Sequence, residues 1–257
     1  MNNLKLTKLE FTLQFTKDTY LSQFIGNTIR GALGQALYKN YPLVYDSILK
    51  VESAESIPNP IVISAPYPSK GHYTIGETLS FCITLLGCAC DFEQSLVDAT
   101  QWMCEGKLAY AQLIDCKQIY GIEWSDSGAQ HIPACEKLTI NFVTPAEIFV
   151  RKKLPSLLDF ETFTERIFIR MSGIFDNYSE GEFVIPYNLI YKKPNIQTEC
   201  DLHVVKFQTN GQPITGLLGQ VRYYGDVTRY LPYVDLCSQI HIGKKTSRGC
   251  GEYSYEI

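Results

Sequence analysis

The chain has 257 residues, a length that fits one large domain or two small ones. Hydrophobic residues make up 45% of it, which is enough to build real cores, while the net charge is −4 and the pI is about 5.6. This acidic balance argues against a protein coated in basic charge for nucleic acid, so any nucleic-acid-binding surface must be local.

The N-terminal segment MNNLKLTKLEF has no apolar stretch and no small-residue cleavage site, so we expect no signal peptide. No run of about 18 apolar residues occurs, so no membrane span is expected. Nine cysteines in a chain without an export signal predict reduced thiols in a cytoplasmic protein, not a disulfide framework. The C-x-C pair Cys88 and Cys90 lacks zinc-finger spacing, and we expect neither a metal nor another cofactor.

The first half of the chain carries the periodicities of a split βαβ pattern. Apolar residues alternate along the predicted strands and recur at helical spacing along the predicted helices. The order is strand, helix, strand, strand, helix, strand, which is typical of a ferredoxin-like domain. These elements are the strand Leu9–Phe15, the helix Ile25–Asn40, the strands Ile61–Ser64 and Leu79–Leu85, the helix Phe92–Met103 with Gly106 as its C-cap, and the strand Ala109–Tyr120.

The turn residues Ser125-Asp126-Ser127-Gly128 indicate a domain boundary, and the same order of elements then repeats. We therefore predict an α+β fold of two tandem ferredoxin-like (βαββαβ) domains, over residues 1–130 and 131–257. The elements of the second are the strand Leu138–Phe142 ending at Thr144-Pro145, a helix Phe160–Ile174 capped by Asp159, the strand Leu202–Phe207, a turn at Asn210-Gly211, the strand Leu217–Tyr224, a helix capped by Thr228 and running to about Ile240, and the strand Cys250–Tyr255.

The most informative segment, here called the glycine loop, lies between the last predicted helix and the last strand. Its glycines would allow a ligand to approach the backbone, while its lysines, arginine and hydroxyl groups suit a phosphodiester backbone. A plain glycine-rich turn with solvated lysines is the alternative. A phosphate-binding loop of the nucleotide-hydrolase type is excluded by the glycine order and by the strand that follows. The loop comprises Gly243, Lys244, Lys245, Thr246, Ser247, Arg248, Gly249, Cys250 and Gly251.

This loop resembles the C-terminal glycine-rich loop of RAMP proteins. Together with the residues before it, the loop looks like the final region of the CRISPR-associated endoribonucleases that process CRISPR repeat RNA. The resemblance extends over nearly the whole chain, in the expected order, and it implies two ferredoxin-like domains. It is carried by Ile29–Gly34, by Tyr73 with Gly76–Phe81 and Leu85–Gly87, by Phe142–Pro145, by Gly216, Gly219, Gly225, Pro232 and Leu236, and by His241–Lys244.

The resemblance also implies a reaction and its partners. Members of this family cut RNA without a metal, by attack of a 2′-hydroxyl on the adjacent phosphate, leaving a 2′,3′-cyclic phosphate and a 5′-hydroxyl. The implied substrate is CRISPR repeat RNA, matured into guide RNAs. Other CRISPR effector subunits are further implied partners, and a monomer or homodimer that does not bind membranes is expected.

That reaction needs a base, an acid and positive charge on the phosphorane. His241 is the first candidate for acid or base, since it ends a predicted helix beside the basic loop, although it could merely pack there. His72, in a turn before a strand, is the second candidate, with a plain surface histidine as the alternative. The other histidines, His131 and His203, are interpreted as structural or solvent-facing. Lys244, with Lys245, could hold phosphate or stabilise the transition state.

Several basic groups outside the loop could also meet RNA. Arg30 lies on the first predicted helix, where ordinary helix surface charge is the alternative. The clusters Arg151-Lys152-Lys153 and Lys192-Lys193 could flank an RNA groove or could be solvated loops.

Three functional hypotheses remain open. The chain is a repeat-processing ribonuclease, a non-catalytic RAMP subunit that binds guide RNA, or a generic ferredoxin-like binding module. The spread of family-like segments favours the first. Many family enzymes carry a histidine between the positions of Tyr38 and Lys50, and this sequence has none there, which favours the non-catalytic RAMP subunit. The third does not account for the basic glycine loop.

Overall fold

The computed structural model describes residues 3–51, 57–125, 134–180, 184, 189, 195–208 and 213–257. The chain divides into two compact units. Unit 1 consists of residues 1–3, 124–246 and 250–257, and unit 2 consists of residues 4–123 and 247–249.

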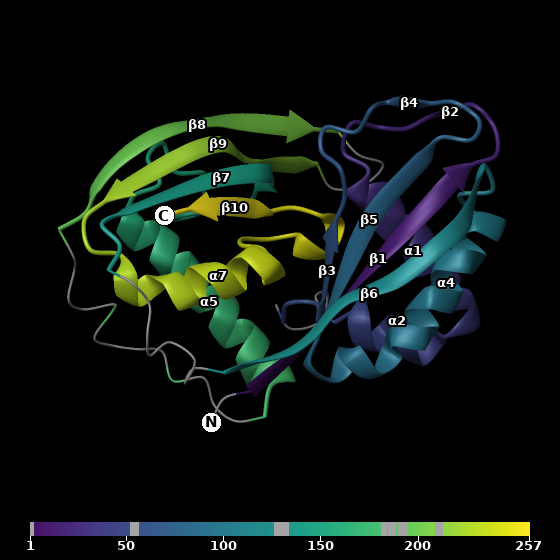
Figure 1. Ribbon diagram of the computed structural model, residues 1–257, viewed down its shortest axis with the longest axis horizontal. Coiled ribbons are helices and arrows are strands. Elements are labelled where there is room, and N and C mark those ends of the chain that lie inside the picture. The colour runs from purple at the N-terminus through teal and green to yellow at the C-terminus, as the bar shows by residue number, and fades with distance from the viewer. Residues whose placement is uncertain are drawn as a thin grey trace. The chain divides into compact units, whose positions relative to one another are not determined.

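Unit 2 is built on a four-stranded sheet with strand order β3-β5-β1-β6. Its β3–β5 and β5–β1 pairs are antiparallel. The helices α1, α2 and α4 lie on one face of this sheet (Figure 1). The elements are β1 (Asn3–Phe15), β2 (Thr19–Tyr20), α1 (Gly26–Asn40), α2 (Pro42–Ile48), β3 (Ile61–Ser64), β4 (His72–Tyr73), β5 (Thr78–Leu86), the 3₁₀ helix η1 (Gly87–Phe92), α4 (Glu93–Glu105) and β6 (Ala111–Ser125).

The alternation along β1 explains the core of unit 2. The side chains of Leu9, Phe11, Leu13 and Phe15 are buried, whereas the residues between them are partly exposed. Phe11 pairs with Phe81 across the strands, and their rings stack with centroids 5.4 Å apart. Every second side chain along this part of β1 is buried, and the buried side chains of α1 recur at helical spacing. These two sets pack together as one apolar layer between the sheet and its helices.

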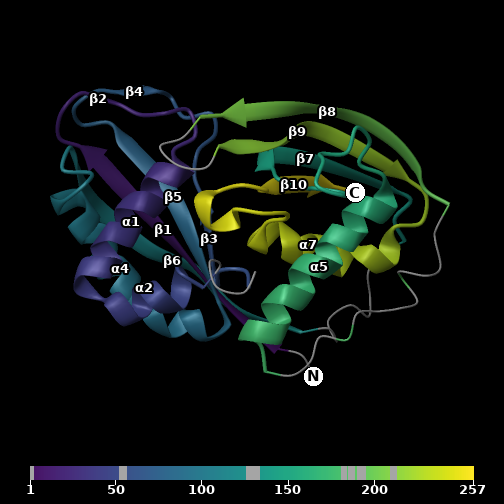
Figure 2. The ribbon, with the colours of Figure 1, turned by 180° about the vertical axis from the view of Figure 1, so that it is seen from behind.

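Unit 1 repeats this architecture with strand order β10-β7-β9-β8. Its helices α5 and α7 cover one face of the sheet (Figure 2). In both units the fourth strand lies beside the first and the third beside the second, so the predicted fold of two ferredoxin-like domains is confirmed. The elements are β7 (Lys137–Ala146), α5 (Phe160–Tyr178), β8 (Gln197–Phe207), β9 (Ile214–Tyr224), the 3₁₀ helix η3 (Thr228–Tyr230), α7 (Leu231–Ile240), the 3₁₀ helix η4 (Thr246–Arg248) and β10 (Tyr253–Glu256).

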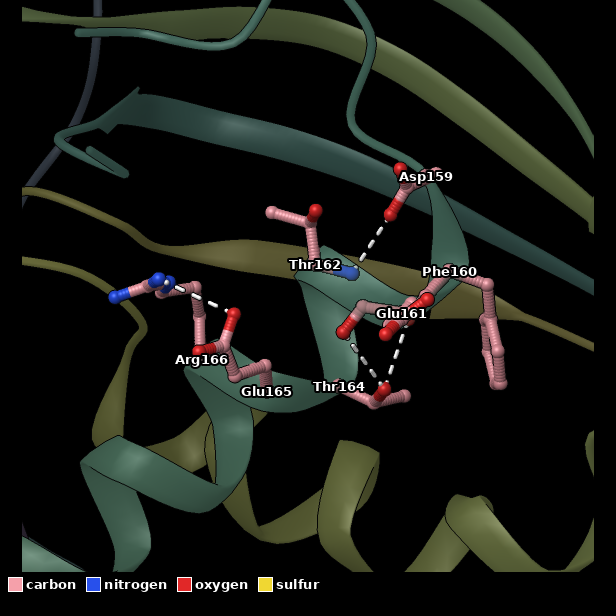
Figure 3. A network of polar contacts seen from close by, with 7 residues as sticks. All are labelled: Asp159, Phe160, Glu161, Thr162, Thr164, Glu165 and Arg166. Carbon is pink, nitrogen blue, oxygen red and sulfur yellow. Dashed lines mark hydrogen bonds and ion pairs between the residues drawn. The ribbon is translucent and has the colours of Figure 1, made fainter. Parts of the chain in front are cut away.

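The first turn of α5 fixes the longest helix of unit 1 (Figure 3). The Asp159 carboxylate accepts a hydrogen bond from the backbone N–H of Thr162 at 2.7 Å, as predicted for the cap. The Thr164 hydroxyl donates back to the carbonyl of Phe160 at 2.8 Å. Capped in this way, α5 places Phe163 and Phe160 against the buried ring of Tyr223 on β9.

Some predicted bounds are wrong. The last helix begins at Leu231, and Thr228 does not cap it, because the Thr228 hydroxyl accepts from the N–H of Cys135 and a 3₁₀ turn precedes the helix. The last strand begins at Tyr253, since Gly251 has a φ of 76°, outside the extended region. The predicted turn at Asn210-Gly211 and residues 126–133 of the expected boundary lie outside the described residues. Within the described ranges, no helix is both long and apolar enough to cross a membrane.

Candidate nucleic-acid-binding site

The glycine loop is folded back on its own ends. Helix α7 stops where His241 adopts φ 57° and ψ 164°, a conformation that ends the helical hydrogen bonding. The N–H of Ile242 then donates to the carbonyl of Gly251 at 3.0 Å, and the N–H of Gly251 donates to the carbonyl of Pro145. The N–H of Lys244 donates to the carbonyl of Glu147. The loop is therefore anchored at the end of β7.

The glycines of the loop are required by the protein's own backbone. Gly243 and Gly251 have φ values of 83° and 76°, which a side chain disfavours. A Cβ on Gly251 would lie 1.8 Å from the carbonyl oxygen of Ile242, and one on Gly243 would lie 2.8 Å from that of Glu147. The close approach that the sequence suggests for a ligand is made here by the chain itself.

Most polar side chains of the loop in unit 1 are satisfied internally. The Lys245 ammonium forms an ion pair of 2.7 Å with the buried carboxylate of Glu147 and also donates to the carbonyl of Pro213. Thr246 is 5% exposed, and its hydroxyl accepts from the guanidinium of Arg170 at 2.9 Å. The polar groups of both Lys245 and Thr246 are thus paired within unit 1.

The tripeptide Ser247–Gly249 belongs to unit 2. Ser247 is 1% exposed, and its hydroxyl accepts hydrogen bonds from Arg30 Nε at 3.3 Å and from Asn59 Nδ2 at 3.1 Å. Arg30 also donates to the carbonyl of Leu49, and Arg248 donates to the Asn27 side chain at 3.4 Å. Gly249 is buried with a φ of 89°. The structure thus brings Arg30 together with the loop, but as a partner of Ser247.

The histidines lie in different surroundings. His241 is 1% exposed, and its ring Nδ1 lies 3.1 Å from the carbonyl oxygen of Cys250. His72 is half-buried on β4, paired across the strands with Tyr20 of β2, and the two rings stack with centroids 4.4 Å apart. His203 is exposed on β8, and His131 lies outside the described residues.

Lys244 is the cation that the loop presents to solvent. Its side chain is exposed, and its ammonium lies 5.9 Å from the centre of the Phe149 ring. A lysine held beside an aromatic ring can hold a phosphate as a point charge. Sequence reasoning did not single out Phe149 or Glu147, because their role depends on a loop about 100 residues further along the chain.

Comparison with known proteins gives two family matches. Residues 140–253 match the model described as CRISPR-associated endoribonuclease Cas6, and residues 40–132 match a model described as an N-terminal domain. The first match contains the whole glycine loop. No curated protein sequence matches the chain at a significant level.

Solved structures share the fold. A Cas6 product complex is 14% identical, with 98% of this chain and 99% of that chain covered and a TM-score of 0.62. Thermus thermophilus Cas6 is 13% identical, with 98% and 99% covered and a TM-score of 0.62. A RAMP protein binding different RNA substrates is 15% identical, with 98% and 100% covered and a TM-score of 0.54. Residues 140–253 thus match the CRISPR-associated endoribonuclease Cas6 family model, and the chain shares its fold over nearly its whole length with solved Cas6 and RAMP structures.

Proposed function

We propose that the chain binds CRISPR repeat RNA and cleaves it, without a metal ion, into guide RNAs. The observation that carries this proposal is the match of residues 140–253 to the endoribonuclease family, since that stretch includes the glycine loop and its exposed Lys244. The RNA-bound relative of the same fold gives further support.

In the proposed reaction a base removes the proton of a 2′-hydroxyl, whose oxygen then bonds to the adjacent phosphorus. The bond from phosphorus to the 5′-oxygen breaks, and an acid gives that oxygen a proton. A 2′,3′-cyclic phosphate and a 5′-hydroxyl result. Lys244 would offset the negative charge of the phosphorane.

Of the two candidate histidines, His72 suits the acid–base role better, because its ring, stacked on Tyr20, is only half-buried. The buried ring of His241 fits a different task, namely positioning the glycine loop through the carbonyl of Cys250. A catalytic role for His241 requires the loop to open.

The test is incubation of the purified chain with the repeat RNA of its own CRISPR array in EDTA. Wild type should give a cyclic-phosphate end, and repeat RNA carrying 2′-O-methyl groups throughout should stay intact. His72→Ala should lower the cleavage rate on the order of 100-fold with unchanged thermal stability, as expected for loss of an acid or base. Cleavage by His72→Ala at the wild-type rate would remove His72 from the mechanism.

A second candidate is a non-catalytic subunit that binds guide RNA. It is favoured by the internal use of Lys245, Thr246 and Ser247 and by the burial of His241. Wild type that binds the repeat RNA tightly in EDTA and leaves it whole would establish this alternative. We further propose that the chain works with other CRISPR proteins, as one similar structure is a partial Cas6-RT-Cas1–Cas2 complex, and that by itself it is a monomer or homodimer.

A further inference from the structure

A short basic turn follows β7 in unit 1. Val150 and Lys153 exchange both backbone hydrogen bonds, at 2.8 and 3.0 Å, so Arg151 and Lys152 form a two-residue hairpin tip. We call residues 150–153 the basic turn. The side chains of Arg151, Lys152 and Lys153 are all exposed.

The backbone of the tip is unusual for these residues. Arg151 and Lys152 have φ values of 49° and 67°, the left-handed region in which a Cβ is crowded. Two-residue tips of this kind are normally made by Asn-Gly, which adopts the conformation readily. The chain therefore keeps two long cationic side chains at a position where the backbone alone would favour small ones. Such exceptions gather at functional sites.

The basic turn lies next to the glycine loop. Glu147, three residues before the turn, pairs with Lys244 in an isolated antiparallel bridge. Phe149 lies between Glu147 and the basic turn in the sequence, and the centre of its ring is 5.9 Å from the Lys244 ammonium. The exposed lysine of the loop and the cations of the turn are thus at the same end of the unit 1 sheet.

The charge at this end is not neutralised from within the segment. Glu147 is the one acidic residue between Ala146 and Leu158, and its buried carboxylate is already paired with Lys245 and with the N–H of Thr215. On the edge strand β8, which pairs with β9, the exposed Lys206 lies opposite Thr215. A chain of net charge −4 therefore gathers exposed cations here.

We propose that the basic turn and Lys244 together form a surface that binds successive phosphates of the RNA backbone. Arg151 can grip a phosphate through two parallel N–H groups, and the lysines act as point charges. Contacts of this type position the RNA without reading its sequence. The inference rests on the proposed function, whose RNA it would hold.

The experiment measures the Kd of repeat RNA carrying 2′-O-methyl groups throughout, at several salt concentrations, so that no cleavage is needed. The key variant is Arg151→Asn with Lys152→Gly, which removes two cations yet gives the turn its preferred residues. We expect it to be at least as heat-stable as wild type and to bind about 10-fold or more weakly. Its salt dependence should be shallower by about 0.7 in log–log slope for each lost phosphate contact.

The matched control replaces Lys17 and Lys39, two exposed lysines of unit 2, by glutamine. It removes the same charge and should bind nearly as wild type does. Equal losses in control and variant would mean that net charge alone matters, which overturns the proposal. So would a variant that retains the wild-type Kd and salt slope while wild type binds RNA. A wild type that binds no RNA at all would remove the proposed function and this inference together.

Discussion

Gly251 is the residue at which the glycine loop passes closest to its own start. Its φ of 76° and the 1.8 Å from a hypothetical Cβ to the Ile242 carbonyl oxygen leave no room for a side chain. Gly76 provides a matched control, because its φ of 86° is similar but nothing lies within 4 Å of its Cβ position.

We therefore expect Gly76→Ala to cost about 1–2 kcal/mol of unfolding free energy from the backbone alone. Gly251→Ala should cost clearly more, since the loop must also shift. Urea unfolding of both variants measures the difference. Equal losses of unfolding free energy in the two variants would mean that the loop can shift to accept a Cβ at Gly251 without further destabilisation.

Glu147 and Lys245 form the ion pair that holds the glycine loop to the end of β7. Their side chains are 3% and 15% exposed, so removing one partner leaves the other charge poorly solvated. Lys245→Met is expected to destabilise the chain by about 3 kcal/mol, in the range for a broken buried pair. The double variant with Glu147→Gln should recover part of that loss, and a double-mutant cycle from urea unfolding gives the coupling. Purely additive losses would show that the pair contributes nothing beyond its separate side chains.

The polar residues of the loop also explain what sequence could not tell about the site. Glycines, lysines and hydroxyls in this spacing suit a phosphate ligand and suit a self-satisfied loop equally well. The difference lies in partners distant in sequence, Arg170 for Thr246 and Asn59 for Ser247. Such pairings follow from the tertiary fold, whereas Lys244 keeps the exposed position that its charge predicts.

Among the elements, the long periodic ones could be predicted and the short ones could not. The strand β1 and the helices α1 and α5 have enough residues for their apolar spacing to be read. Helix α2 has seven residues, and β2 and β4 have two each, too few for a period to appear. The first residues of β8 show no apolar pattern, because both faces of this edge strand are at least partly exposed.

Helix α5 depends on its first turn, where Asp159 supplies the cap seen in Figure 3. Asp159→Ala should cost about 1 kcal/mol, because the N–H of Thr162 loses its acceptor. Asp159→Asn keeps an acceptor oxygen and should cost much less. Thermal unfolding followed by circular dichroism measures both. An alanine variant as stable as wild type would mean that water caps the helix equally well.

At the scale of the whole molecule, the repeated strand order gives each unit its own apolar core. The sequence predicts this duplication because each half alternates and repeats independently of the other. All nine cysteines are free, and they are distributed over both units. They therefore serve as separate reporters of the two cores.

Burial raises the pKa of the Cys104 thiol to about 11 in unit 2 and that of Cys237 to about 12 in unit 1. At pH 8 both thiols stay protonated in the folded chain and should resist N-ethylmaleimide, since the thiolate is the reactive form. The exposed Cys88 should be labelled first. In increasing urea, labelling of Cys104 and Cys237, followed by mass spectrometry, reports the opening of each unit.

Because Gly251 lies in unit 1, Gly251→Ala should lower the urea midpoint for Cys237 more than that for Cys104. Equal shifts at both thiols would mean that the two cores unfold as one cooperative body, with the energy of the glycine loop shared between them.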